Sequence, residues 1–247
     1  MKILVCVSKT PETTTKIRFT ADQSELDTNG VQYIMNPYDE WYALVRALEL
    51  KEQHGGSVTI LNVGPAINDP TLRKGLAIGA DDAVRIDADP KSALGVAHQI
   101  AAHAKTAAYD LLLFGKETIS YNGAEVPAMV AELLDLPFIS FASKLAMESE
   151  TKVVLERDIE GGTEAIALDL PFVISAAKGL AEQRIPNMRG IMMAKRKPLQ
   201  VVEATPVDDL SAPVSYELPA EKGSVKLVDP DNMTELARLL REEAKVI

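Results

Sequence analysis

The sequence has one cysteine and no long apolar run, and each of these absences narrows what the chain can be. Cys6 has no partner for an intramolecular disulfide or a cysteine metal cage, and its place in the apolar run 3–7 predicts a buried structural thiol. No apolar stretch approaches the roughly 20 residues of a membrane-spanning helix, and no secretion signal follows Met1. We therefore expect a soluble protein of a reducing compartment, with cytoplasmic localisation and no membrane insertion.

The short motifs of common catalytic sites are also absent. The sequence contains no G-x-S-x-G elbow, no P-loop and no G-x-G-x-x-G fingerprint. The three histidines are His54, His98 and His103, and the last two lie five residues apart, which is not the i, i+4 spacing of a metal pair. We expect no catalytic residue, no bound metal and no enzyme activity.

Positive charge is scarce. The 247 residues carry 26 Lys and Arg against 36 Asp and Glu, a formal net charge of −10. Nucleic-acid binding needs a basic face that neutralises phosphates, and the short basic cluster 195–197 does not supply one. Nucleic acid is therefore not expected among the partners.

The first half of the chain alternates between short apolar runs and amphipathic segments, which predicts an α/β fold with a parallel sheet. The expected strands are residues 3–7, 58–63, 84–86 and 111–114. The expected helices are residues 36–56, 69–81, 92–108 and 123–134, the first starting with Asn36 as the cap and Pro37 in the first turn. Ligands of such sheets bind at the carboxyl ends of the strands, which are here residues 7–8, 63–64 and 114–115.

The pattern changes after residue 138. Residues 144–156 and 164–175 are predicted to form antiparallel strands on either side of a turn at 160–162. Beyond Pro198 the chain is proline-rich and polar until a final helix from Asp231. We expect an α/β domain over 1–198 and, over 199–247, an arm whose terminal helix docks on another chain.

The loop 114–125 joins a predicted buried strand to a helix. Free backbone N–H groups and the dipole at a helix N-terminus favour an anion, and glycines allow the backbone to approach a ligand closely. The loop is either a nucleotide site or an ordinary connection, and spacing alone does not decide. The same holds for Met188, Met192 and Met193, which are either core residues or an adaptable contact surface.

Several longer stretches carry a family resemblance through their order and spacing. They are residues 3–9 (I-L-V-C-V-S-K), 30–40 (G-V-Q-Y-I-M-N-P-Y-D-E), 63–65, 75–81, 113–116, 157–164 (R-D-I-E-G-G-T-E) with Pro171, and 191–198 (I-M-M-A-K-R-K-P). Together they resemble the beta subunits of the electron transfer flavoproteins, over essentially the whole chain.

The resemblance implies an adenine-nucleotide α-hydrolase-like, Rossmann-like domain that pairs with an alpha subunit carrying the redox FAD. The pair would take electrons from dehydrogenases, such as the acyl-CoA dehydrogenases of fatty acid beta-oxidation, and pass them to a membrane quinone oxidoreductase. It also implies a structural AMP. The matching cofactor-binding positions are Cys6, Asn36, Pro37, Tyr38, Asp39, Val63, Gly115, Lys116, Thr118, Asn122, Gly123, Ala124, Glu125 and Val126.

The loop 120–126 departs from the family pattern. Relatives carry aspartates and an Asn-Gln-Thr run where this chain reads S-Y-N-G-A-E-V. Backbone donors would then hold the phosphate, while Glu125 would repel it if directed inward. Two alternatives remain: a bifurcating beta subunit with a second FAD in this pocket, and a stand-alone nucleotide-binding stress-type module on the same fold.

The resemblance also assigns two protein contacts. Met188 matches an apolar anchor that inserts into the dehydrogenase, within a docking loop over 183–198. Asp158 matches an acidic position that helps to set the orientation of the mobile FAD domain. The expected docking residues are Ile185, Met188, Arg189, Ile191 and Met192.

Overall fold

The computed structural model describes residues 1–247 and is built on a nine-stranded sheet in the order β11-β5-β4-β1-β6-β10-β7-β8-β9. From β11 to β7 every neighbouring pair is parallel, whereas β8 and β9 are antiparallel additions at one edge. The α/β fold predicted from the sequence is therefore confirmed. The strands are β1 (Lys2–Cys6), β4 (Ser57–Val63), β5 (Asp82–Asp87), β6 (Leu111–Gly115), β7 (Phe138–Met147), β8 (Lys152–Ile159), β9 (Gly162–Asp169), β10 (Phe172–Ala176) and β11 (Leu199–Glu203).

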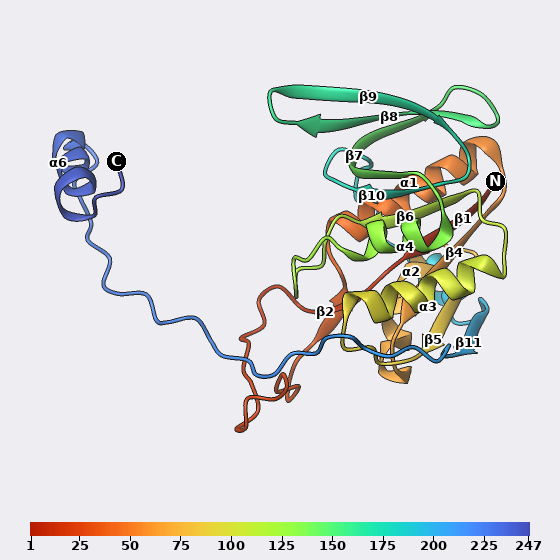
Figure 1. Cartoon of the computed structure of the whole chain (residues 1–247), viewed down its shortest axis with the longest axis horizontal. Coiled ribbons are helices and arrows are strands. Elements are labelled where there is room, and N and C mark those ends of the chain that lie inside the picture. Colours follow the sequence, from red (N-terminus) through yellow and green to blue (C-terminus); the bar gives the residue numbers. More distant parts are fainter.

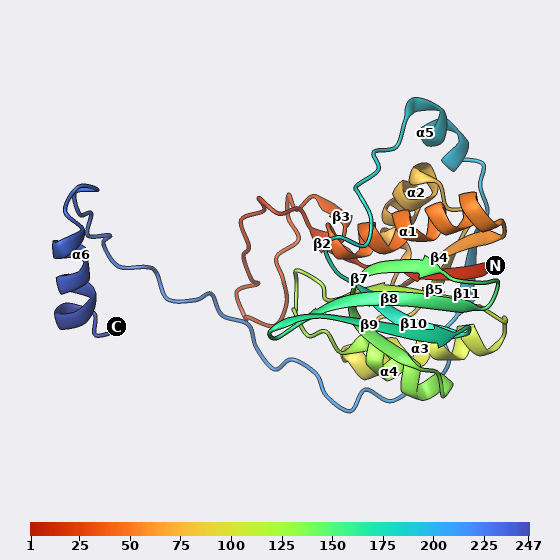
Figure 2. The same cartoon turned by 90° about the horizontal axis from the view of Figure 1, so that it is seen from above.

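Helices cover both faces of the parallel part, with α1 and α2 on one side and α3 and α4 on the other (Figures 1 and 2). The central strands are mostly apolar because each face meets a helical layer. In β1, Ile3 and Val5 pack with the α1 side of the core, whereas Leu4 and Cys6 pack with the α3 side. The helices are α1 (Asp39–His54), α2 (Asp69–Ile78), α3 (Ala93–Lys105), α4 (Val126–Leu134), α5 (Met188–Ala194) and α6 (Met233–Arg238). None of them has both the length and the apolar character needed to cross a membrane.

The predicted start of the first helix is wrong by three residues. Helix α1 begins at Asp39 after Tyr38, and Asn36 does not cap it. The buried Asn36 amide instead reaches a distant loop: its Nδ2 donates to the Glu117 carbonyl (3.1 Å) and its Oδ1 accepts from the Ile119 N–H (3.0 Å). The Asn36 side chain does not cap the helix because it is used in these two long-range hydrogen bonds instead.

The antiparallel edge confirms the turn at residues 160–162 but corrects both predicted strands. The segment 144–156 is not one strand, because it covers the end of β7, a bend at residues 148–151 and the start of β8. β8 and β9 pair from Lys152↔Asp169 to Ile159↔Gly162, and Gly161 in the turn has φ +87°. The segment 164–175 is not one strand: it breaks after Asp169, and β10 returns to the middle of the sheet between β6 and β7. Two short strands, β2 (Lys9–Pro11) and β3 (Tyr33–Met35), form a separate antiparallel pair.

The irregular part of the chain begins later than expected. Leu199–Glu203, predicted to lie in the arm, is β11, and it pairs in parallel with β5 at the sheet edge. Residues 204–232 then run without regular structure except for short turns, and α6 with the following turn η2 (Leu239–Glu243) lies apart from the body (Figures 1 and 2). Large apolar side chains are exposed along this arm: Leu210, Val214, Leu218, Val225, Leu227 and Met233.

Candidate functional site

A cavity of about 590 Å³ lies at the carboxyl ends of β1, β4 and β6, where a parallel sheet is expected to bind its ligand. Its size is that of a small-molecule site. Nine of the residues predicted to bind the cofactor line it: Cys6, Val63, Gly115, Lys116, Thr118, Gly123, Ala124, Glu125 and Val126.

The remaining predicted cofactor residues, Asn36, Pro37, Tyr38, Asp39 and Asn122, do not line this cavity. Asn36 lies one layer behind it, where its amide fixes the backbone at residues 117–119. Tyr38 is exposed and has a positive φ of 64°, an uncommon conformation for a residue with a side chain.

Other lining residues were missed because they come from distant parts of the chain. Ser8, Lys9 and Thr10 follow β1, and the arm contributes residues 211–213. The rule that places ligands at strand ends points to Ser8, but no local feature of the sequence brings the arm to this place. The remaining residues missed include Glu40, Asn62, Lys91, Ser92, Val96 and Ile100.

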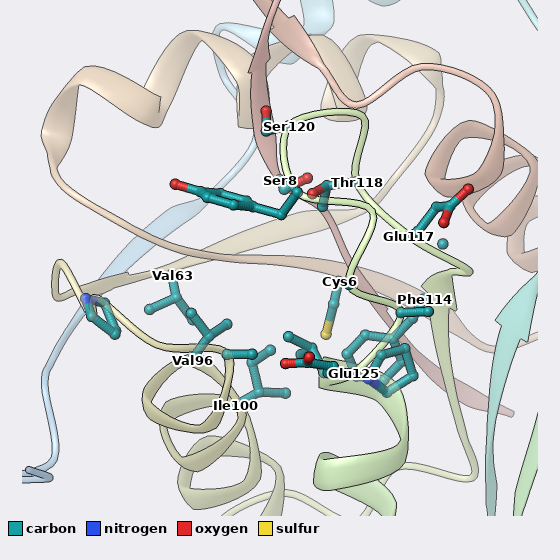
Figure 3. A pocket seen from close by; sticks show the side chains of 18 of the residues that line it. Cys6, Ser8, Val63, Val96, Ile100, Phe114, Glu117, Thr118, Ser120 and Glu125 are labelled. Carbon is teal, nitrogen blue, oxygen red and sulfur yellow. The ribbon is translucent and has the colours of Figure 1, made fainter. Parts of the chain in front are cut away.

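The cavity has an apolar part and a polar part (Figure 3). Val63, Val96, Ile100 and Phe114 gather on one side, and the hydroxyls of Ser8, Thr118 and Ser120 lie on the other. The Thr10 Oγ is buried and has no hydrogen-bond partner within the protein. This atom has no surface open to the cavity, so it is not a contact for a ligand there.

The loop between β6 and α4 closes one wall of the cavity. Helix α4 has no capping side chain at Glu125, so N–H groups of its first turn remain available to an anion, apart from the one that Pro127 lacks. The Glu125 carboxylate itself points into the cavity (Figure 3). A carboxylate accepts hydrogen bonds from ribose hydroxyls or an amine and repels phosphate.

The base of the cavity contains a buried carboxyl group. Glu40 accepts hydrogen bonds from Ser8 through the backbone N–H (2.7 Å) and the hydroxyl (2.6 Å). Burial nevertheless raises the pKa of Glu40 to about 8. A Cβ on Gly115 would lie 2.8 Å from Glu40 Cγ, so only glycine fits over this carboxyl group. Burial also raises the pKa of the Cys6 thiol well above its ordinary value, which makes it an unreactive wall residue.

Glu40→Gln is expected to remove part of the pH dependence of stability. The folded-state pKa of Glu40, about 8, lies above its ordinary value of 4.5, so its contribution is fully present below pH 4.5 and is lost as the pH rises to 8. Between pH 5 and 8 the wild type should lose roughly a few kcal/mol of unfolding free energy relative to the variant. Urea unfolding across this range measures the difference, and parallel curves would show that Glu40 is ionised in the folded protein. Burial also raises the pKa of Asp39, to about 6. Asp39 is present in both the wild type and the Glu40→Gln variant, so the difference between their unfolding free energies reports on Glu40.

The arm is attached to the rim of the cavity through Asp209. Its carboxylate accepts from the Lys91 N–H (2.7 Å), the Ser92 N–H (3.1 Å) and the Ser92 hydroxyl (2.6 Å) at the start of α3. The N-terminus of α3 therefore already has a negative group from the chain itself. The start of α4, which has no capping side chain, is therefore the helix N-terminus that remains open to an anionic group of a ligand.

The predicted docking residues lie together on a short projection around α5, which stands above α2 in Figure 2. Ile185, Met188, Arg189, Ile191 and Met192 are all exposed. The preceding segment is fixed to α1, where the Arg184 carbonyl accepts from the Trp41 indole N–H (3.0 Å) and the Arg184 guanidinium pairs with Glu52 (2.7 Å). The methionines are therefore surface residues, not core residues.

Asp158 lies elsewhere, near the tip of the β8–β9 hairpin. Its carboxylate is exposed and accepts a long hydrogen bond from the Thr163 hydroxyl (3.4 Å). The neighbouring Arg157 is already paired with Glu164 (2.6 Å), so it does not neutralise Asp158. No group of three or more His, Cys, Asp or Glu side chains in the structure is arranged to hold a metal ion.

Comparisons with known proteins agree with this geometry. The family model described as the electron transfer flavoprotein domain matches residues 24–207. The electron transfer flavoprotein subunit beta of Bacillus subtilis is 36% identical, with all of both chains covered. The mitochondrial subunit beta of Oryza sativa subsp. japonica is 35% identical, again over all of both chains, and the human subunit beta is 33% identical over 95% of this chain and 91% of its own. Most of the residues that line the cavity at the strand ends lie in the part of the chain that the family model matches. With this match and the full-length similarity to these subunits, the chain belongs to the electron transfer flavoprotein beta-subunit family.

Proposed function

We propose that this electron carrier subunit works in a heterodimer with an alpha subunit that holds the redox FAD, and that it binds a structural AMP. The heterodimer takes electrons from dehydrogenases of the acyl-CoA type and delivers them to a quinone oxidoreductase. The cavity at the carboxyl ends of the strands, with apolar side chains on one side and the uncapped start of α4 in its wall, is the observation that carries the nucleotide part.

The residues of the cavity fit AMP in their chemistry. Val63, Val96, Ile100 and Phe114 would contact the flat apolar base, and backbone N–H groups at the start of α4 would receive the phosphate. Glu125 would accept from the ribose or the base amine, because its charge is unfavourable beside phosphate. The hydroxyls of Thr118 and Ser120, which line the cavity, would complete a donor set that does not depend on the aspartates of relatives.

Nucleotide analysis of the purified heterodimer tests this assignment. We expect denaturation to release about one FAD and one AMP per heterodimer, because this chain would bind the smaller nucleotide and its partner the flavin. Reversed-phase chromatography separates and quantifies the two. Two FAD without AMP would instead identify a bifurcating subunit, and a chain that purifies alone as a stable monomer would support the stress-type module.

The projection around α5 is proposed as the dehydrogenase docking surface. An apolar centre of Met188 and Met192 has a basic rim of Arg189, Lys195 and Arg196, all exposed. This arrangement fits a partner that offers an apolar pocket with an acidic edge. Small interfaces of this type suit transient electron-transfer encounters.

Asp158 is proposed to pair with a basic residue of the alpha subunit in one orientation of its FAD domain. The exposed, unneutralised carboxylate at the hairpin tip supports this role. Asp158→Lys should lower the rate of electron transfer several-fold, the effect of losing an exposed ion pair worth about 1 kcal/mol, while the FAD content stays the same. Asp169→Lys at the other end of the hairpin is the matched control, and equal rates in both variants would remove Asp158 from this role.

A further inference from the structure

Helix α5 has one face made of small residues and one made of methionines. Gly190 lies against α2 so closely that an added Cβ would be 2.4 Å from the Ala77 carbonyl oxygen, and Ala194, one turn later, is buried. Side chains four residues apart lie on the same face of a helix. Gly190 and Ala194 therefore face inward, and Met188 and Met192 share the face turned away from α2.

Polar contacts at the ends of the two helices hold α5 in this orientation. The Arg73 guanidinium donates to the carbonyls of Ala194 (2.8 Å) and Lys197 (2.7 Å) just after α5. In return, the Lys197 ammonium donates to the carbonyls of Leu76 (3.0 Å) and Ala80 (2.5 Å) at the end of α2. Each cation satisfies carbonyls that a helix end leaves free, so α5 cannot turn its methionines inward without breaking four hydrogen bonds.

The thioethers on this surface are open to solvent. Met188 is 75% exposed, Met192 68% and Met193 47%, whereas Met35 in the core is completely buried. Three of the eight methionines of the chain thus lie within six residues on one projection. Exposed thioethers are the ones that oxidants reach, and oxidation turns a flexible apolar side chain into a polar one.

We propose that Met188, Met192 and Met193 form a reversible oxidation site, at which peroxide switches off docking of the electron donor. The inference rests on the docking role proposed above for this surface. A sulfur lone pair attacks one peroxide oxygen, the O–O bond breaks, an S–O bond forms, and the released hydroxide takes up a proton and leaves as water. Sulfur loses two electrons and peroxide gains them, so a thiol-dependent methionine sulfoxide reductase reverses the reaction. The sulfoxide no longer fits an apolar pocket on the partner.

The test uses the complete heterodimer treated with hydrogen peroxide and then with catalase. Peptide mass analysis should find sulfoxide at the three exposed positions of the docking surface and none at Met35. The kcat/KM for reduction by an acyl-CoA dehydrogenase with its acyl-CoA substrate should fall roughly tenfold, while direct reduction of the flavin by dithionite is unchanged. Treatment with methionine sulfoxide reductases and a thiol should restore the rate.

A variant that carries leucine at positions 188, 192 and 193 separates this site from other oxidation damage. Its rate after peroxide is compared with its own untreated rate, and the ratio should stay near one because no sulfur remains on the docking surface around α5. A wild-type rate that is unaffected by complete oxidation of the three methionines would overturn the oxidation site. If Met188→Glu also leaves the rate unaffected, the docking role is wrong as well. If Met188→Glu lowers the rate but oxidation does not, only the oxidation site is wrong.

Discussion

Replacing Met188 with glutamate is expected to lower the kcat/KM for electron acceptance from the dehydrogenase by roughly thirtyfold or more. Met188 is the most exposed large apolar residue of α5 and lies on the face turned away from α2. A buried anchor at the centre of a small interface commonly contributes about 2 kcal/mol or more, and a charge in an apolar pocket adds a desolvation cost. Stopped-flow reduction of the heterodimer by the dehydrogenase measures the effect.

Two controls locate the effect of Met188→Glu at the docking step. Met188→Leu keeps an apolar side chain of similar volume and should retain most of the rate. The FAD content and dithionite reduction of the glutamate variant should equal those of the wild type, because Met188 does not line the cavity. A glutamate variant with a normal kcat/KM would exclude Met188 as the anchor.

Deleting residues 204–247 is expected to abolish co-purification with the alpha subunit while the body of the chain stays folded. Nearly the entire apolar core lies before residue 204, since Leu239 is the only buried apolar residue beyond it. The arm, in contrast, exposes Val214, Val225 and Leu227 almost completely. Side chains of this type, on a segment with few contacts to its own body, are expected to be covered by a partner.

A substitution series distinguishes loss of binding from loss of folding. Serine at Val225, Leu227 and Met233 should weaken the heterodimer, whereas serine at the neighbouring Glu221 and Lys222 should not, because those polar side chains contribute no apolar contact. Affinity capture on a tagged alpha subunit measures how much of each variant associates with it. Circular dichroism measures whether each variant keeps its secondary structure. Full capture of the truncated chain would mean that the heterodimer forms through the body alone.

Much of the sheet could be predicted because its signals are local and strong. The apolar run at β1 matches a strand buried on both faces, and the strands 58–63 and 111–114 lie within one residue of β4 and β6. Strand ends in a parallel sheet meet at one edge, so the place of the cavity also followed from the sequence. The family resemblance then gave nine of its lining residues.

Helix boundaries and the strands near the end of the domain were harder to predict from the sequence, because long-range contacts compete with local patterns. Asn36 and Pro37 have the composition of a helix start, yet Asn36 forms two hydrogen bonds with residues more than eighty positions away. The segment Leu199–Glu203 was assigned to the arm because the chain beyond Pro198 is proline-rich and polar. Its pairing with β5 depends on a strand that is remote in the chain, which no local window detects.

The sequence by itself determined the parallel α/β architecture, the edge of the sheet at which the cavity lies and the membership of the family. Periodicity suffices for the first two, because apolar side chains on strands have few other places to go. The family followed instead from its resemblance in the order and spacing of several longer motifs. Tertiary structure alone decided which side of each remaining segment faces solvent. Met188 and Met192 became surface residues because Gly190 and Ala194 occupy the contact with α2, and residues 211–213 became part of the cavity because Asp209 fixes the arm to the start of α3.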